Sequence, residues 1–363
     1  MKKILIANLL RPEIKKINKY IPSQTREQLS REVKISQKDL VKLDTGENPY
    51  GEKFQDKAAV KNIPFYSYPD PASTNLRKKI SEYTNLPTNR ILCGNGSDEI
   101  IDLILRAFVN ANEEIIICPP TFPMYEFLGQ IAGVTVKKIL RNKDFSVNVE
   151  KIKNSVTKKT KVLFIDSPGN PTGTITPVET FEELLKLPVI VVADEAYFEY
   201  CQKTVISLVK KYPNLIILRT FSKWAGLAGL RVGYAIASSE IIDVFLSIKQ
   251  PYNVNSVAQK FAEMALDNRK TLLERLKDII VYRENYYNEL SKFKELTVYK
   301  TQGAYVVFKA KNNPQRLYEF LRKNGILVKS IKQPLLGNSL RMTLAKGTEL
   351  KKVIKTLTTY YEN

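Results

Sequence analysis

The sequence predicts an α/β protein with a large, doubly wound, mostly parallel sheet and a smaller α+β domain. Short apolar runs alternate with segments of helical periodicity through the middle of the chain, which is typical of parallel sheets covered by helices. Polar stretches that contain glycine or proline directly follow several of these runs. The last third of the chain changes to a mixed order of strands and helices. With 363 residues, the chain can bury a large core in two domains.

We place the domain boundaries where composition and periodicity change. Residues 1–40 are polar and lysine-rich, and we assign them to an N-terminal arm that belongs to the small domain. Residues 41–250 carry the alternating pattern and are predicted to form the large domain. Residues 251–363 are expected to supply linking helices and the small C-terminal domain.

The composition excludes several kinds of site. The chain contains no histidine, which removes Ser-His-Asp and Cys-His catalysis and most zinc sites, so no metal is expected. The cysteines Cys93, Cys118 and Cys201 lie in or beside apolar runs without metal-binding spacing, as reduced thiols of a cytoplasmic protein do. No apolar run approaches the ~20 residues of a membrane span. We interpret the first residues as an arm and not as a signal peptide.

The net charge of +20 makes a nucleic-acid-binding protein the alternative from another class. The lysines are scattered along the whole chain, however, and no nucleic-acid-reading motif accompanies them. A lysine-rich solvated surface explains the charge better, so we expect neither a nucleic acid nor a membrane as a partner. Such a surface would still attract phosphorylated metabolites at low ionic strength.

The first unit of the large domain is a strand, a loop and a helix. Residues 91–93 form the apolar strand, and apolar positions repeat every three or four residues over 100–108. Gly-Asn-Gly-Ser-Asp-Glu, residues 94–99, lies between them. Ser97 or Asp98 would cap the helix, and the N–H groups of a helix start can also bind phosphate. An ordinary capped helix and an anion site both remain open on local grounds.

The next two apolar runs, residues 114–118 and 161–166, are predicted to be buried parallel strands. The first leads through Pro-Pro-Thr and Phe122 into a helix, where an aromatic residue is more often core than a cofactor platform; we expect Tyr125 to pack in the core. The second is followed by Ser-Pro-Gly-Asn-Pro-Thr-Gly, residues 167–173. This rigid turn stands at the carboxyl end of a strand, where open α/β sheets place ligands.

A fourth apolar run, residues 188–193, ends at Asp194. An unpaired carboxylate at the end of a buried strand is costly, so Asp194 should have a cationic partner. That partner is either a structural arginine or a cationic group of a ligand, and the sequence leaves both open.

The segment after the strand 215–218 carries the most informative chemistry. Thr220 and Ser222 precede Lys223, and Arg231 follows it by eight positions. A lysine near a second cation, with water excluded, loses proton affinity and can form a Schiff base with a carbonyl. The two hydroxyls and Arg231 could hold a phosphate. A phosphate anchor beside such a lysine is what pyridoxal phosphate requires, although a plain basic loop remains possible.

The remainder of the chain is expected to be helical first and mixed afterwards. A strand over 232–237 is followed by two helical stretches, of which the longer should contain a break. The predicted elements are helices 238–250 and 254–293, strands 304–310, 326–331 and 339–344, and helices 314–324 and 348–361.

Several of these segments resemble one known family. Arg-Thr-Phe-Ser-Lys, residues 219–223, with the following Ala-Gly-Leu-Arg-Val-Gly-Tyr, resembles the cofactor-lysine segment of fold-type I, pyridoxal-phosphate-dependent class I/II aminotransferases, and is similar to their histidinol-phosphate aminotransferase branch. Gly-Asn-Gly-Ser-Asp-Glu, Asn-Pro-Thr-Gly and Asp-Glu-Ala-Tyr match the same family. The resemblance covers nearly the whole chain from about residue 40 onward.

The resemblance implies a role for each matching residue. Lys223 would hold pyridoxal 5'-phosphate and act as the catalytic base. Asp194 would face the ring nitrogen, and Asn170 and Tyr197 would share the ring's 3-oxygen. Phe122 would stack on the ring. The residues implied for the phosphate are Ser97, Asp98, Thr220, Ser222 and Arg231, joined by Tyr68 from the partner subunit of a homodimer.

Glutamate as amino donor and the pair histidinol phosphate and imidazole acetol phosphate are the implied substrates. Arg341 would clamp an anionic end of the substrate, and Asn48 belongs to the turn at the substrate entrance. Two residues depart from the family's phosphate-binding pattern: Ser23 stands where tyrosine is common, and Lys329 where arginine is common. A lysine keeps the charge but loses the bidentate fork.

Other small phosphorylated ketones, such as dihydroxyacetone phosphate, and aromatic amino acids therefore stay open as substrates. Threonine-phosphate decarboxylase shares the scaffold but matches the phosphate turn less well. A silent homologue is disfavoured, because Lys223, Asp194 and Arg231 are all present.

Overall fold

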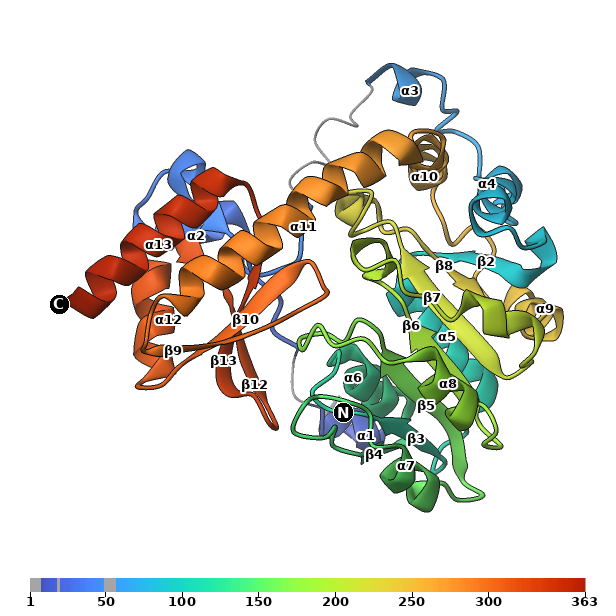
Figure 1. Cartoon of the computed structure of the whole chain (residues 1–363). Coiled ribbons are helices and arrows are strands. Elements are labelled where there is room, and N and C mark those ends of the chain that lie inside the picture. The colour runs from blue at the N-terminus through green and yellow to red at the C-terminus, as the bar shows by residue number, and fades with distance from the viewer. Residues whose placement is uncertain (1–7, 18–19, 49–56, 363) are drawn as a thin grey trace, which may run out of the picture.

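A computed structural model describes residues 8–17, 20–48 and 57–362. The chain forms two lobes, and the long helix α11 (Arg269–Ser291) runs from one to the other (Figure 1). The predicted turn that contains Asn48 lies largely outside the described residues. Among the described residues, no helix combines the length and apolar character that crossing a bilayer would demand.

The large lobe is built on a seven-stranded sheet with the order β2-β8-β7-β6-β5-β3-β4. Strand β8 is antiparallel to both of its neighbours, and all other pairs are parallel. This confirms the predicted doubly wound, mostly parallel sheet. The strands are β2 (Ile91–Gly94), β3 (Glu114–Ile117), β4 (Thr135–Lys138), β5 (Thr160–Asp166), β6 (Ile190–Asp194), β7 (Leu215–Thr220) and β8 (Gly233–Ile236).

Helices cover both faces of this sheet, which explains the uninterrupted apolar runs of its strands. Alternate residues of β5 belong to different cores: Val162 and Phe164 pack on one face, Leu163 and Ile165 on the other. Helices α5 (Ser97–Phe108), α6 (Met124–Ala132) and α9 (Ser239–Ile248) cover the first face. The second face is covered by α4 (Thr74–Thr84), α7 (Val149–Ser155), α8 (Val178–Leu184) and α10 (Ser256–Asp267).

The small lobe contains a four-stranded antiparallel sheet with the order β12-β13-β10-β9. A two-stranded parallel pair joins the N-terminal β1 (Val41–Lys42) to β11 (Ile326–Leu327). The other elements of this lobe are α2 (Arg26–Val33), β9 (Leu296–Tyr299), β10 (Tyr305–Ala310), α12 (Pro314–Lys323), β12 (Lys329–Gln333), β13 (Gly337–Thr343) and α13 (Gly347–Glu362).

Several elements differ from the sequence-based expectation. Strands β4 and β9 were not anticipated, because each is only four residues long and partly exposed. The predicted strand 326–331 divides into β11 and β12, which belong to different sheets. The long helical stretch breaks at Asn268, as expected, into α10 and α11.

Short helices complete the chain, and the first of them lies on the large lobe: Glu13 of α1 approaches Gly133, at the end of α6. These short elements are α1 (Pro12–Lys15), α3 (Lys57–Lys61), and the 3₁₀ turns η2 (Gln37–Asp39), η4 (Thr88–Arg90), η5 (Phe198–Tyr200), η6 (Ile206–Lys210) and η7 (Ala228–Leu230).

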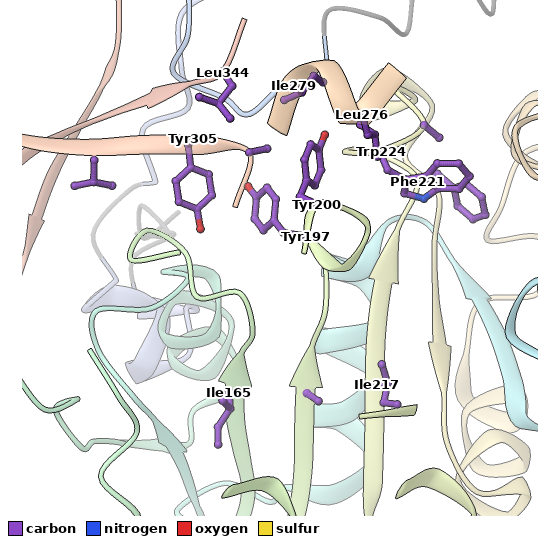
Figure 2. Close-up of a cluster of buried hydrophobic side chains, with 14 of the residues drawn as sticks. Ile165, Tyr197, Tyr200, Ile217, Phe221, Trp224, Leu276, Ile279, Tyr305 and Leu344 are labelled. Carbon is purple, nitrogen blue, oxygen red and sulfur yellow. The ribbon is translucent and has the colours of Figure 1, made fainter. Parts of the chain in front are cut away.

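Aromatic side chains join the two lobes. Tyr197, just after β6, meets the ring of Tyr305 from β10 edge-on, with 5.2 Å between the ring centroids. Figure 2 shows these rings beside Tyr200, with Leu276 and Ile279 of α11 close by. The Tyr305 hydroxyl also donates a hydrogen bond to the carbonyl of Gly169. The small lobe is thereby fixed against the strand ends of the large sheet.

Candidate active site

A cavity of about 1110 Å³ lies between the lobes, at the carboxyl ends of β5, β6 and β7. Its wall contains nearly all the residues that the sequence pointed to, although they come from distant segments. The wall does not include Asn48 or Tyr68. The predicted residues that line it are Ser97, Asp98, Phe122, Asn170, Asp194, Tyr197, Thr220, Ser222, Lys223, Arg231, Lys329 and Arg341.

Lys223 follows β7, and backbone carbonyls hold its amine. Nζ lies 3.2 Å from the carbonyl oxygen of Thr45 and 3.3 Å from that of Gly46. A Cβ on Gly46 would stand only 3.0 Å from Nζ, and this residue has a φ of +72°, so glycine is required there. Within the described segments, no carboxylate forms an ion pair with Lys223. Its amine can therefore exchange neutral carbonyls for a ligand.

The start of α5 is open to an anion. The helix begins at Ser97 with Gly96 at the N-cap and has no side-chain cap, which corrects the prediction that Ser97 or Asp98 caps it. The N–H groups of an uncapped first turn remain available as donors. Gly96 has a φ of +79°, and a Cβ on it would come within 2.6 Å of Arg231 Nη2. Glycine at this turn thus lets the arginine approach the helix start.

Arg231 and Ser222 complete this corner of the cavity. One guanidinium nitrogen, Nη1, lies 3.4 Å from Ser222 Oγ, and Nη2 donates to Asp98 Oδ2 at 3.0 Å. Thr220 Oγ1 accepts a hydrogen bond from the Ser222 backbone N–H, so it shapes the loop. Helix N–H groups, a hydroxyl and an arginine together form an anion site, although Asp98 offsets part of the charge of Arg231.

Asp194 is buried at the end of β6 and pairs with no cation among the described residues. Its Oδ2 accepts a 2.6 Å hydrogen bond from Tyr125 Oη, and its Oδ1 accepts one from the Ala196 N–H. Burial raises the pKa of this carboxyl to about 7, and the charges of Asp166 and Asp98 act in the same direction. Within the described part of the chain, no lysine or arginine pairs with Asp194. Of the two predicted partners, a structural arginine is therefore not found among the described residues, and a cationic group of a ligand remains.

The neighbouring acids do have arginine partners. Arg219 binds Glu195 Oε2 through Nε at 3.0 Å and Nη2 at 2.8 Å, and both side chains are buried. Arg141 donates to Asp166 Oδ1 at 2.8 Å and lies fully inside the protein. The acids around Asp194 are thus neutralised by the protein itself, while Asp194 faces the cavity.

The loop 167–173 is fixed from below by Asp166. Its Oδ2 accepts from the Asn170 backbone N–H at 2.7 Å, and its Oδ1 accepts from Thr121 Oγ1 at 2.8 Å. The Asn170 side chain uses its oxygen to accept a 2.7 Å hydrogen bond from Arg341 Nη1. The amide NH₂ group of Asn170 therefore remains available to an acceptor in the cavity.

Arg341 and Lys329 form the cationic part of the wall on the small lobe. Arg341 also donates through Nη2 to the carbonyl of Asp44 at 2.8 Å, while its buried Nε has no hydrogen-bond partner in the part of the chain that the structure describes. Burial and the nearby Arg341 lower the pKa of Lys329. A buried donor without a partner and a lysine beside a second cation both favour an anionic ligand.

Ser23, which stands where the family commonly has tyrosine, forms a hydrogen bond within the protein. The Ser23 hydroxyl donates to Asp44 Oδ2, while Lys42 Nζ lies 2.9 Å from Asp44 Oδ1. Asp44 is buried, and with Ser23 and Lys42 it forms a polar cluster in the cavity wall. Ser23 therefore lines the cavity, but its hydroxyl donates to Asp44 and not to a ligand.

Two predicted residues lie outside the cavity wall. The Asn48 amide donates to the carbonyl of Trp224 at 2.8 Å and so holds the residue after Lys223. Tyr68 is 80% exposed and stacks on Tyr252, with 4.4 Å between the ring centroids. Within this one subunit, Tyr68 does not contact the site.

Sequence reasoning missed several residues of the site. Tyr125 was expected only to pack, yet its hydroxyl is bound to Asp194. Gln333 of β12 pairs with Thr121 through two hydrogen bonds, accepting from its N–H at 2.9 Å and donating to its carbonyl at 3.0 Å. The signal available for Tyr125 was its spacing of one helical turn from Phe122. No local signal connects Gln333 to Thr121, because they are 212 residues apart.

Comparisons with known proteins identify the family of this chain. The family described as aminotransferase class I and II matches residues 38–357. A histidinol-phosphate aminotransferase of Dehalococcoides mccartyi is 39% identical over 322 residues, which cover 88% of this chain and 90% of that protein.

Solved structures show the same fold. The histidinol-phosphate aminotransferase from Clostridium acetobutylicum has a TM-score of 0.80 at 26% identity and covers 89% of this chain and 100% of its own. The enzyme of the same name from Sinorhizobium meliloti, in complex with pyridoxal-5'-phosphate, has a TM-score of 0.86 at 20% identity and covers 97% and 98%.

Proposed function

The chain belongs to the aminotransferase class I and II family and is a pyridoxal-phosphate-dependent transaminase, and from this premise we propose that it interconverts histidinol phosphate and imidazole acetol phosphate with glutamate as the amino donor. The names of its relatives, at 37–40% identity over most of the chain, support this substrate pair. The observation that carries the proposal is that Lys223, Asp194 and Arg231 line one cavity.

The residues of the cavity fit pyridoxal phosphate. Asp194 is a buried carboxylate that no lysine or arginine of the described segments neutralises, and the protonated ring nitrogen would supply the cation. The uncapped start of α5, with Ser222 and Arg231, suits a phosphate. Asn170 has an NH₂ group to donate, and Tyr197 has a hydroxyl that can do the same for the ring's 3-oxygen. Phe122 offers an aromatic face in the same wall.

Each residue then has a chemical role. When bound, the cofactor supplies an electron sink. Lys223 Nζ would anchor the cofactor and, once released by the incoming substrate amine, would take the proton from the α-carbon of the substrate as general base. Asp194 would keep the ring nitrogen protonated through its negative charge. Arg341 would bind the carboxylate of glutamate, and Lys329 would contribute to holding an anionic acceptor.

A second acceptor remains a candidate because of Lys329. A lysine is a point charge without the fork that arginine offers a phosphate, and Ser23 directs its hydroxyl to Asp44. A smaller phosphorylated ketone, such as dihydroxyacetone phosphate, would need fewer contacts at this end of the cavity.

The test is an acceptor screen with glutamate as donor. We expect kcat/KM for imidazole acetol phosphate to exceed that for dihydroxyacetone phosphate and for an aromatic 2-oxo acid by tenfold or more. Lys223→Ala should abolish turnover with all three. Lys329→Arg should improve only the phosphorylated acceptors. A higher kcat/KM for dihydroxyacetone phosphate or for the aromatic acid would replace the proposed substrate.

We further propose a cytoplasmic homodimer in which Tyr68 completes the partner's phosphate site. The surface around Tyr68 supports it: Phe65 and Tyr66 are 71% and 94% exposed, and clustered exposed aromatic residues are typical of interfaces. Mixing inactive Lys223→Ala and Tyr68→Ala chains should restore activity, because a mixed dimer contains one intact site. Light scattering that shows only a monomer, or mixtures that stay inactive, would contradict the shared site.

A further inference from the structure

Tyr125 is the one side chain that donates a hydrogen bond to Asp194 among the described residues. Tyr125 Oη lies 2.6 Å from Asp194 Oδ2, and the tyrosine is fully buried. The second hydrogen bond of the carboxylate comes from a backbone N–H, that of Ala196. The backbone bond is present for any residue at position 196 except proline. Among the described residues, the Tyr125 hydroxyl therefore provides the only hydrogen bond to Asp194 that a side-chain substitution can remove.

The Tyr125 ring is held in place by two others. It stacks on Phe164 of β5, with centroids 4.8 Å apart and planes inclined by 14°. It meets Phe122 edge-on, with centroids 5.5 Å apart at 84°. Phe122 lines the cavity directly. One rigid side chain thus supports both the acid and the aromatic wall beside it.

The direction of the hydrogen bond is determined by the chemistry of the pair. Burial and the charge of Asp194 raise the pKa of Tyr125 well above its ordinary value, so its hydroxyl keeps its proton and donates. Donation favours the ionised carboxylate. The other charged groups that face Asp194 are Asp166 on β5 and Asp98 on α5, and both disfavour that form. Lys223 and Arg231 line the same cavity without pairing with it.

We propose that Tyr125 is a positioning residue of the transaminase reaction: its hydroxyl holds Asp194 ionised and oriented toward the ring nitrogen of the cofactor, while its ring supports Phe122. This inference rests on the proposed function. Tyr125 does not itself line the cavity, so it acts through these two residues. The chain has no histidine, so no imidazole can serve as the donor to this acid.

The test is Tyr125→Phe, which removes one oxygen atom and keeps both ring contacts. Tyr286→Phe is the matched control, because Tyr286 is equally buried on α11 and does not line the cavity. We expect Tyr125→Phe to lower kcat and the affinity for pyridoxal phosphate at pH 8 by about tenfold or more, as for a lost hydrogen bond to a charged group. The low-pH limb of the kcat profile should move up by about one pH unit, with little change in the KM for glutamate.

A measurement on cofactor-free protein separates this inference from the proposed function. In a double-mutant cycle of Tyr125→Phe and Asp194→Asn, the unfolding equilibrium constants at pH 8 should be non-additive by about tenfold. An additive cycle, or a Tyr125→Phe pH profile that coincides with those of the wild type and Tyr286→Phe, would overturn the role of Tyr125. A wild-type protein that binds pyridoxal phosphate but transfers no amino group would instead overturn the proposed function.

Discussion

The ends of β5 and β6 make an informative comparison, because they hold two aspartates at the same level of the sheet. Asp166 and Asp194 are register partners on these adjacent parallel strands, and both are at least 95% buried. Asp166 is paired with Arg141 and bound by Thr121 and the Asn170 N–H. Asp194 is bound by Tyr125 and a backbone N–H and has no cation among the described residues.

The difference shows that one sheet edge holds both a structural aspartate and an aspartate suited to a ligand. The charge of Asp166 is neutralised inside the protein, so that the carboxylate can serve as a rigid base for the loop 167–173. The charge of Asp194 is left uncompensated beside a cavity, at a cost in stability. Such a cost is retained where a ligand supplies the missing cation, and perturbed acids in clefts are characteristic of functional sites.

The largest expected effect comes from making Asp194 neutral. Asp194→Asn should lower kcat by about 10³-fold, because it removes the charge that holds the ring nitrogen protonated. The cofactor-free variant should nevertheless be more stable than the wild type at pH 8, because the buried charge is gone. Steady-state kinetics and urea unfolding measure the two effects. A variant that keeps a tenth of the wild-type activity would contradict the role of Asp194.

The next largest effect is expected from removing Arg141, because Asp166 would then lack a cationic partner, as Asp194 does. Arg141→Met should destabilise the protein by about 3–5 kcal/mol, because it leaves a buried carboxylate and several carbonyls without their donor. Urea unfolding measures the loss. Arg31→Met is the control, since the Arg31–Glu27 pair is exposed on α2 and should contribute little. Equal losses for the two variants would remove the distinction between these pairs.

The two strand ends should also differ in their response to pH. Since the folded pKa of Asp194 is about 7 and lies above its unfolded value near 4, the folded protein binds more protons between these values. The stability of the cofactor-free protein should therefore fall as pH rises from about 4 to 7, by up to ~1.4 kcal/mol per pH unit for this group. Glu199, whose pKa burial raises to about 8, adds to the same trend.

The share of Asp194 in this pH dependence is separable. Asp194→Asn should flatten the decline between pH 5 and 7 and leave the part due to Glu199. Unfolding midpoints at pH 5.5, 7.0 and 8.5 test this. An unchanged slope in the variant would mean that Asp194 ionises normally in the folded protein.

The smallest effect is expected for Gln333, which is connected to Asp166 through Thr121. Gln333→Ala removes the two hydrogen bonds to the Thr121 backbone and should cost about 1–2 kcal/mol. Because Phe122 follows Thr121, the affinity for the cofactor should also fall severalfold. The pH dependence of kcat should stay that of the wild type. A shift in that pH dependence would show that the two strand ends are not independent.

Much of the fold followed from local patterns in the sequence. The strands β5, β6 and β7 are largely apolar because both faces of the sheet are covered, and each ends in a polar residue that lines the cavity: Asp166, Asp194 and Thr220. The short strands β4 and β9 were missed because four partly exposed residues give too weak a pattern. The cap predicted at Ser97 or Asp98 was wrong, since the N-cap is Gly96, which has no side chain to bind the N–H groups of the first turn.

The sequence by itself determined the fold class, the strand ends that build the site, and Lys223 with its neighbouring hydroxyls and Arg231, because these features are contiguous or strictly periodic in the chain. Tertiary structure alone decided which acid receives which partner. Asp194 and Glu195 are adjacent, yet one faces the cavity and the other meets Arg219, because successive side chains of a strand point to opposite sides. Their partners come from separate elements, and only folding brings Tyr125, Arg141 and Arg219 to their acids.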